Sequence, residues 1–139
     1  MDALLVHIRQ QPGCTLVTVA GDIDAVTAPR LDAWLSEALA TGLPVIADLS
    51  QVAFIDAAGL NALAAAARQA RTRRASLHVV SGAGQVRWLI TITGLDQAIP
   101  LARTIAEAAA ALSPPRGTAS KCAARLRRLR QRYALARWR

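Results

Sequence analysis

The chain has 139 residues, of which 53% are hydrophobic and 19% are charged, so it can bury a substantial core and is not disordered throughout. Its two cysteines, Cys14 and Cys122, lie far apart and form no CxxC pair, which argues against a structural zinc site and a disulfide scaffold. The N-terminus lacks a basic region followed by a long apolar stretch, and no apolar run approaches the roughly 18 residues that span a bilayer. These features predict a cytoplasmic protein.

The formal net charge of +8 is unevenly divided along the chain. Residues 1–112 hold eight arginines against nine acids, whereas residues 113–139 hold nine basic residues and no acid. Two prolines and a glycine within residues 113–118 stop the preceding helical pattern. We therefore expect one folded domain over residues 1–112, a linker over 113–118 and an arginine-rich segment over 119–139.

The N-terminal part of the domain predicts a hairpin followed by a helix. Two apolar runs rich in β-branched residues, 4–9 and 15–20, flank a turn at residues 11–13. Apolar residues then recur at helical spacing from Thr27, the expected helix cap, until a glycine at position 42 ends the pattern.

The rest of the domain alternates between strands and helices. Residues 44–49 form an apolar run typical of a buried strand, and a second helix is expected to begin at Asp56. A strand is expected next at residues 77–80, followed by a helix around residues 86–90 that stops at Gly94. A last short strand at 99–101 and an alanine-rich helix at 102–112 complete the domain. This order predicts an α/β fold in which a mostly parallel sheet carries an N-terminal antiparallel hairpin at one edge and is covered by helices.

The clearest motif lies at residues 48–60, where a strand leads through a loop into a helix start. Asp56 is placed to cap that helix, and the small residues Ala57, Ala58 and Gly59 leave its first turn sterically open to another molecule. Amide groups in a first helical turn also favour an acceptor or an anion. This pattern predicts a docking surface. The alternative is that Asp56 is only a cap and that the small residues let the helix pack closely on the sheet.

This segment closely resembles the signature of the STAS domain of bacterial anti-sigma factor antagonists, in which a DLS-like strand end leads to a D-S-S-G-L helix start. Residues 21–31 resemble the family's G-E/D-L/I-D…T…L block, and residues 87–96 resemble its R-x-L…TGL ending. Residues 77–80 occupy the place of its fourth strand. The resemblance covers about residues 4–112, in order and with spacing kept, and it implies the STAS fold.

The resemblance also implies a non-enzymatic regulator that binds an anti-sigma factor, often a serine kinase, and so frees a sigma factor to direct transcription. In the family, the kinase phosphorylates a serine at the start of the second helix, which breaks the complex. That serine falls on Ala58 and the one before it on Ala57, so the resemblance implies no phosphoacceptor at either position. We favour a permanently binding-competent antagonist controlled by its abundance or by its partner; a diverged module whose partner is not a kinase is the other outcome.

A partner-binding patch follows from the same resemblance, because family members present the loop that holds Asp22 and Asp24 to their partner. The expected patch consists of Asp22, Asp24, Thr27, Asp56, Ala57, Ala58, Gly59 and Leu60. A plainer interpretation stays open for the loop residues: the two acids merely terminate a strand and solvate a loop, and Thr27 is only a cap.

No catalytic constellation emerges from the sequence. His7 and His78 fall in expected strands without neighbouring metal ligands, and the serines have no evident base or nucleophile elbow. We therefore expect no enzymatic activity, no metal and no cofactor. The alternative function is a STAS subunit of a lipid-transport ABC system that binds its ATPase.

The arginine-rich segment has a pattern of its own. Its apolar residues recur at three- and four-residue spacing, which predicts a basic amphipathic helix: Cys122, Leu126, Leu129, Tyr133 and Ala136. Such a helix suits anionic lipid, nucleic acid or an acidic protein surface. Two alternatives are a helix that packs its thin apolar stripe on the domain with its arginines in water, and a mostly disordered basic tail.

Overall fold

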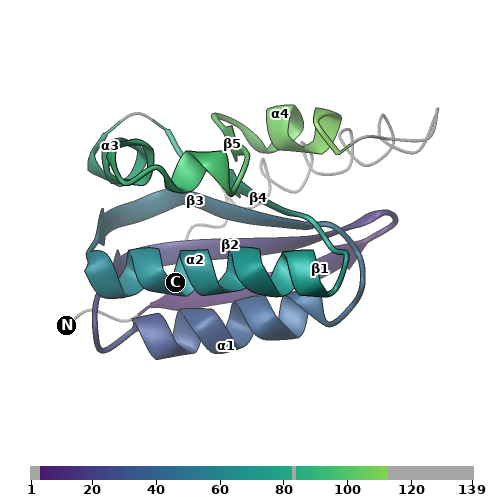
Figure 1. Ribbon diagram of the computed structural model, residues 1–139, viewed down its shortest axis with the longest axis horizontal. Helices are drawn as coiled ribbons and strands as arrows, with labels where there is room; N and C mark the ends of the chain where they lie inside the picture. The colour runs from purple at the N-terminus through teal and green to yellow at the C-terminus, as the bar shows by residue number, and fades with distance from the viewer. Residues whose placement is uncertain (1–3, 83, 113–139) are drawn as a thin grey trace.

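A computed structural model describes residues 4–82 and 84–112, which form a five-stranded sheet with helices on both of its faces (Figure 1). The strands are β1 (Leu5–Gln11), β2 (Cys14–Ile23), β3 (Val45–Ile55), β4 (Leu77–Val80) and β5 (Leu101–Ala102). The helices are α1 (Ala28–Leu39), α2 (Ala57–Thr72), α3 (Gln85–Ile92), the 3-10 helix η1 (Leu95–Gln97) and α4 (Ile105–Ala110).

The strands lie side by side in the order β1-β2-β3-β4-β5. The first pair is antiparallel, and every later neighbouring pair is parallel. β1 and β2 are joined by the two-residue loop Pro12–Gly13, in which Gly13 has a φ of 90°; proline followed by a residue with positive φ is the chemistry of a type II turn. The expected α/β fold, with an antiparallel hairpin at one edge, is confirmed.

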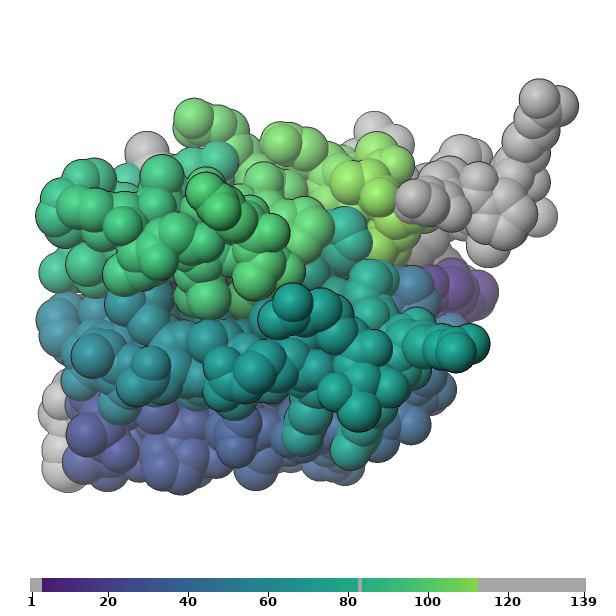
Figure 2. All heavy atoms as spheres, viewed as in Figure 1, coloured from purple at the N-terminus to yellow at the C-terminus, as the bar shows by residue number. Residues whose placement is uncertain are grey.

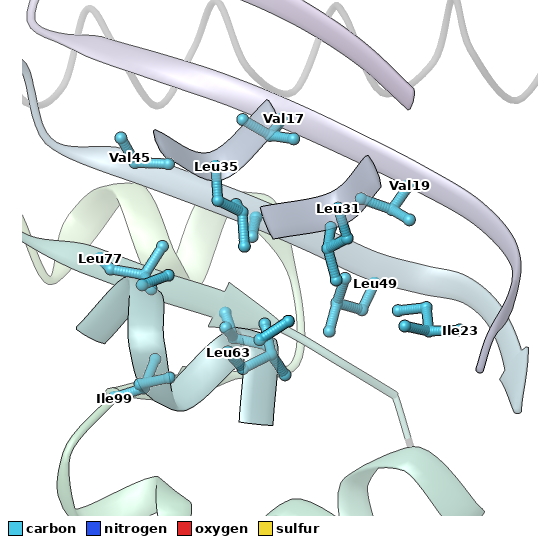
Figure 3. Packing of buried hydrophobic residues seen from close by; sticks show 14 of the residues in the cluster. Val17, Val19, Ile23, Leu31, Leu35, Val45, Leu49, Leu63, Leu77 and Ile99 are labelled. Atoms are coloured by element: carbon cyan, nitrogen blue, oxygen red, sulfur yellow. The ribbon is translucent and has the colours of Figure 1, made fainter. Parts of the chain in front are cut away.

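One face of the sheet carries most of the core. α1 and α2 lie side by side along this face (Figures 1 and 2), and their leucines meet the valines of the strands (Figure 3). Leu31, Leu35 and Leu63 are fully buried there, and each such side chain stabilises the fold by about 1.5–3 kcal/mol. We call this the α1–α2 face. It fixes where both helices begin, and so it positions the loops that precede them.

The opposite face is packed by the last helix. Ile105, Ala108 and Ala109 of α4 form a second apolar cluster with Leu16 and Ile46 of the strands, together with Cys14, Val80 and Ala102. Because alternate residues of a strand point to opposite faces, these even-numbered strand positions all face away from α1 and α2. We call this the α4 face.

Some expected boundaries are wrong. β3 does not end at residue 49 but continues to Ile55, because the long second half of β2 pairs with it through two register shifts. The last helix spans Ile105–Ala110 rather than residues 102–112, because the Thr104 hydroxyl accepts a hydrogen bond from the Glu107 amide (3.0 Å) and so sets the start of the helix.

The expected linker at 113–118 and the expected basic helix at 119–139 lie outside the described residues. Among the residues that the structure describes, no helix has the length and apolar character that crossing a membrane requires.

Candidate functional site

The motif residues gather at one edge of the sheet, where the parallel strands β2 and β3 end. β2 leads into a loop that begins at Asp24, and β3 leads through Asp56 into α2. The two segments are joined directly, because the amide of Asp56 donates a hydrogen bond to the carbonyl oxygen of Ile23 (3.1 Å). The β2–α1 loop and the start of α2 therefore form one continuous surface.

The β2–α1 loop is held by Asp24 and Thr27. One carboxylate oxygen of Asp24, Oδ1, accepts hydrogen bonds from the amides of Val26 (2.9 Å) and Thr27 (3.0 Å). The Thr27 hydroxyl accepts from the Asp24 amide and donates to the carbonyl oxygen of Asp22, both at 2.9 Å. These hydrogen bonds fix the conformation of the loop.

The loop also sets the charge of Asp24. The hydrogen bond from the Thr27 amide, with a further one from the Val26 amide, holds the pKa of the Asp24 carboxyl below its usual value. Asp24 is consequently a carboxylate at every physiological pH, and it is half-exposed at this edge.

Thr27 differs from its expected role. It occupies the N-cap position of α1, but its side chain makes no cap hydrogen bond. Its hydroxyl instead forms hydrogen bonds with the backbone of Asp22 and Asp24 in the preceding loop. Only 4% of Thr27 is exposed. Its hydroxyl is therefore part of the framework of the loop and is shielded from solvent.

The start of α2 follows the sequence expectation more closely. Asp56 has extended backbone angles, and its carboxylate accepts a hydrogen bond from the Gly59 amide (3.1 Å), so the predicted cap is confirmed. The carbonyl oxygen of Asp56 accepts from the Leu60 amide (3.0 Å). Two amides of the first turn are thus satisfied by one residue.

Gly59 points inward rather than towards a partner. It is buried, and a Cβ atom at this position would lie 2.5 Å from Cγ1 of Ile55 and 2.7 Å from Cγ2 of Ile23. Both distances are far shorter than the 3.5–4.0 Å of an ordinary carbon contact. For this residue the packing alternative explains the small side chain, because only glycine lets α2 approach the ends of β2 and β3.

The other motif residues reach the surface to different degrees. Ala57 is exposed, whereas Ala58 and Leu60 are half-buried and pack partly against the core. Asp22 and Asp56 are half-buried. Asp22 lies within β2, not in the loop where the resemblance placed it.

Two exposed apolar residues at the same edge are absent from the sequence-based patch. Val26, in the loop fixed by Asp24, is 82% exposed, and Phe54, which pairs with Asp22 across β2 and β3, is 39% exposed. A single apolar residue in a loop or at a strand end has no periodicity that sequence analysis can detect. We define the candidate docking surface as the outward-facing set Asp22, Asp24, Val26, Phe54, Asp56, Ala57, Ala58 and Leu60.

The candidate docking surface combines the carboxylates of Asp22, Asp24 and Asp56 with the exposed apolar side chains of Val26 and Phe54. Within residues 4–82 and 84–112, no three His, Cys, Asp or Glu side chains are grouped so that they could hold a metal ion. His78 is buried in β4, and burial lowers the pKa of its imidazole, so it is neutral at physiological pH. It lies away from this edge, in the strand half that pairs with Ile46.

Comparison with known proteins places this geometry in a family. A model of the STAS domain matches residues 6–108. The chain is 29% identical over 108 residues to the anti-sigma-F factor antagonist RsfB of Mycobacterium tuberculosis. The aligned residues cover 77% of this chain and 88% of that protein. It is 31% identical over 86 residues to the anti-sigma-B factor antagonist of Listeria monocytogenes, covering 61% and 75% respectively.

Solved structures agree with these matches. An anti-sigma factor antagonist from Mycobacterium paratuberculosis superposes with a TM-score of 0.74 and 32% identity, covering 81% of this chain and 96% of that one. The unphosphorylated form of the anti-sigma factor antagonist SpoIIAA has the same fold, with a TM-score of 0.61, 18% identity and coverage of 76% and 92%. The chain therefore belongs to the STAS domain family.

Proposed function

We propose that this protein is an anti-sigma factor antagonist that regulates transcription by binding an anti-sigma factor through the candidate docking surface. One observation supports the proposal most directly. The loop that begins at Asp24 and the start of α2, which is built of small residues, lie together at one edge of the sheet. The proposal is supported by relatives of similar length that are named anti-sigma factor antagonists. The alternative, a subunit of a lipid-transport ABC system, is not favoured by these relatives.

The partner, in this proposal, is an anti-sigma factor of the serine-kinase type that cannot switch this protein off by phosphorylating the start of α2. Ala57 and Ala58 have no hydroxyl, and the nearest threonine of the loop, Thr27, is buried with its hydroxyl engaged. Binding is then controlled by the abundance of this protein or by its partner. We also propose that the protein acts in the cytoplasm, where RNA polymerase is.

Ala58→Glu tests the docking surface. The change places a carboxylate in the first turn of α2, two residues after Asp56, where it imitates part of the charge of a phosphoserine. A carboxylate in the first turn of a helix is itself stabilising by about 0.3–1 kcal/mol, so the variant is expected to fold. The control is Ala40→Glu, which adds the same charge at the exposed C-terminal end of α1, where the helix dipole disfavours an anion by about 0.3–1 kcal/mol.

The assay is affinity capture from the source cell with the wild type and both variants, followed by mass spectrometry. We expect the wild type and Ala40→Glu to retain a kinase-fold anti-sigma factor and Ala58→Glu to lose it. Retention by all three proteins would exclude the start of α2 as the binding site. Recovery of transporter ATPase components instead would support the alternative function, a STAS subunit of an ABC system.

Ala58→Ser tests the kinase type of the partner. With the captured partner and ATP, the variant is expected to gain one phosphate by intact-mass analysis, while the wild type gains none. A phosphate on the wild type would mean that another hydroxyl has replaced the family position. No phosphate on the variant would show that the partner is not a kinase acting at this helix start.

A further inference from the structure

The end of α2 carries a concentration of positive charge. Four arginines with exposed side chains lie within seven residues there: Arg68, Arg71, Arg73 and Arg74. We call this set the α2 basic end. Residues 57–95 contain no acid, whereas residues 1–56 hold seven acids against two arginines. Charge is therefore strongly segregated within a domain whose net charge is close to zero.

The α2 basic end lies far from the candidate docking surface. α2 begins beside that surface and runs back along the sheet to the point where β4 begins, so its two ends lie at opposite ends of the sheet (Figure 1). Its sixteen residues span about 24 Å. A ligand at the α2 basic end is therefore separate from a partner at the candidate docking surface, and both can bind at once.

Arg74 holds its charge in a conformation that favours glycine. The amide of Ala75 donates a hydrogen bond to the carbonyl oxygen of Ala70 (2.8 Å), and the amide of Arg74 donates to that of Arg71 (3.2 Å), which is the Schellman ending of a helix. Arg74 has a φ of 53°, the left-handed value that glycine usually supplies at this position. The helix dipole favours cations here, but Arg71 and Arg73 already supply them in ordinary conformations. Local structure therefore gives no reason for an arginine at position 74.

The charge of these arginines is not neutralised by the rest of the chain. Within residues 4–82 and 84–112 no ion pair joins them to a carboxylate, and Arg73 donates instead to the carbonyl oxygen of Ser36 on α1 (3.5 Å). The chain outside those ranges holds nine basic residues and a single acidic side chain, Asp2. An anionic ligand of the α2 basic end must therefore be another molecule.

The composition of this end of the helix fits a phosphate backbone. Residues 68–76 contain no aromatic residue and no acid. The large apolar residues that are exposed in the described chain lie elsewhere: Leu5, Val26, Phe54, Trp88 and Ile92. A protein interface has an apolar core, a membrane-bound helix needs an apolar face, and single-stranded nucleic acid is held by stacking on aromatic rings. Duplex DNA, whose bases are already stacked, requires only donors and cations placed against its phosphates.

We propose that the α2 basic end binds the phosphate backbone of duplex DNA, independently of base sequence and of the candidate docking surface. Arg68 and Arg71 are neighbours on the helix surface, about 5–6 Å apart between their Cβ atoms, and each guanidinium group can donate two parallel hydrogen bonds to one phosphate. Arg74 extends the array beyond the end of the helix. Four such contacts contribute about −3.6 to the slope of the logarithm of the binding constant against the logarithm of the salt concentration.

Fluorescence anisotropy of a short labelled DNA duplex with the full-length protein tests this assignment. Each lost phosphate contact weakens binding about 8-fold at about 0.1 M salt. Arg71→Gln with Arg74→Gly is accordingly expected to weaken binding about 60-fold and to reduce the slope by about 2. Arg74→Gly alone also removes the left-handed arginine, so its thermal unfolding midpoint is expected to rise while its affinity for DNA falls. A loss of affinity that accompanies a higher midpoint does not come from misfolding.

The matched control is Arg30→Gln with Arg103→Gln. It removes the same charge from two exposed arginines, one at the start of α1 and one that follows β5, both away from the end of α2. We expect this variant to keep the wild-type slope. Equal weakening by the two double variants would show that only the net charge matters and would overturn the proposal. It would also be overturned if the wild type did not bind the duplex, or if Arg71→Gln with Arg74→Gly kept the wild-type slope.

The other anionic partners are separated by the same variants. Sedimentation with phosphatidylglycerol vesicles that requires Arg71 and Arg74, without DNA binding that requires them, would assign this surface to a membrane instead. Affinity capture with Arg71→Gln and Arg74→Gly combined is expected to recover the same protein partner as the wild type, and loss of that partner would place the arginines in a protein interface instead. Ala58→Glu is expected to lose the protein partner and to keep the DNA slope, so that failure of the proposed function and failure of DNA binding are distinguishable.

Discussion

Gly59 offers the sharpest test of how the start of α2 is built. The structure assigns it to packing, because the space where a side chain would begin is filled by Ile55 and Ile23, which are 1% and 0% exposed. Gly59→Ala places a carbon 2.5 Å and 2.7 Å from their side-chain atoms. Neither isoleucine can swing into solvent, so α2 or the ends of the strands must move.

The expected cost follows from two opposing effects. Adding a methyl group to a filled core costs about 1–3 kcal/mol. Replacing glycine by alanine in a helix returns at most about 1 kcal/mol through backbone propensity. We therefore expect Gly59→Ala to lower the free energy of unfolding by about 1–2 kcal/mol, which lowers the urea midpoint by roughly 1 M at an m-value of about 1–2 kcal/mol/M.

The matched control is Gly82→Ala. A Cβ at Gly82 would meet nothing within 4 Å, and its φ lies outside the left-handed region. The same chemical change there is expected to leave the free energy of unfolding unchanged or to raise it by up to about 1 kcal/mol. Urea unfolding followed by circular dichroism measures both. If Gly59→Ala were as stable as the wild type, or if both variants were destabilised equally, the packing role of Gly59 would be refuted.

Three further predictions concern single side chains. Asp56→Ala removes the cap of α2 and is expected to cost about 0.5–2 kcal/mol in urea unfolding, whereas Asp32→Ala, an exposed acid within α1, changes stability by less than about 0.5 kcal/mol; equal losses would argue against the cap. Because the pKa of Asp24 is lowered in the folded state, its charge stabilises the fold above its unfolded value of about 3.8, and this contribution is lost as the pH falls through the folded value. Asp24→Asn is therefore expected to be less stable than the wild type at pH 7 and equal to it at the acid end of a pH series; a difference independent of pH would contradict this. Burial lowers the pKa of His78, so the unfolded chain takes up its proton first and stability decreases as the pH falls below about 6.5. His78→Gln is expected to flatten that part of the pH profile in thermal unfolding, and an unchanged slope would show that another group is responsible.

The sequence by itself determined the order and type of the elements, because the evidence for them is local. Period-2 and period-3.6 patterns of apolar residues depend only on neighbours in the chain, and so does the capping position of Asp56. The family signature added the fold and the place of the docking edge. The antiparallel pair at one edge of the sheet, the parallel pairs that follow it and the hydrogen bond from the Gly59 amide to Asp56 agree with the expected fold and cap, whereas the docking edge stays a prediction.

The tertiary structure decided which motif residues face outward. Gly59 and Thr27 belong to the signature, yet neither faces outward. Gly59 packs against Ile55, and the buried Thr27 hydroxyl donates a hydrogen bond to the carbonyl oxygen of Asp22 within its own loop. Val26 and Phe54 carry no sequence signal and are exposed beside Asp24 and Asp22. The same holds for the length of β3, which depends on pairing with β2 and not on its own residues. Burial is set by what other segments of the chain supply, so a local pattern specifies a strand or a helix start but not which of its side chains remains free to meet a partner.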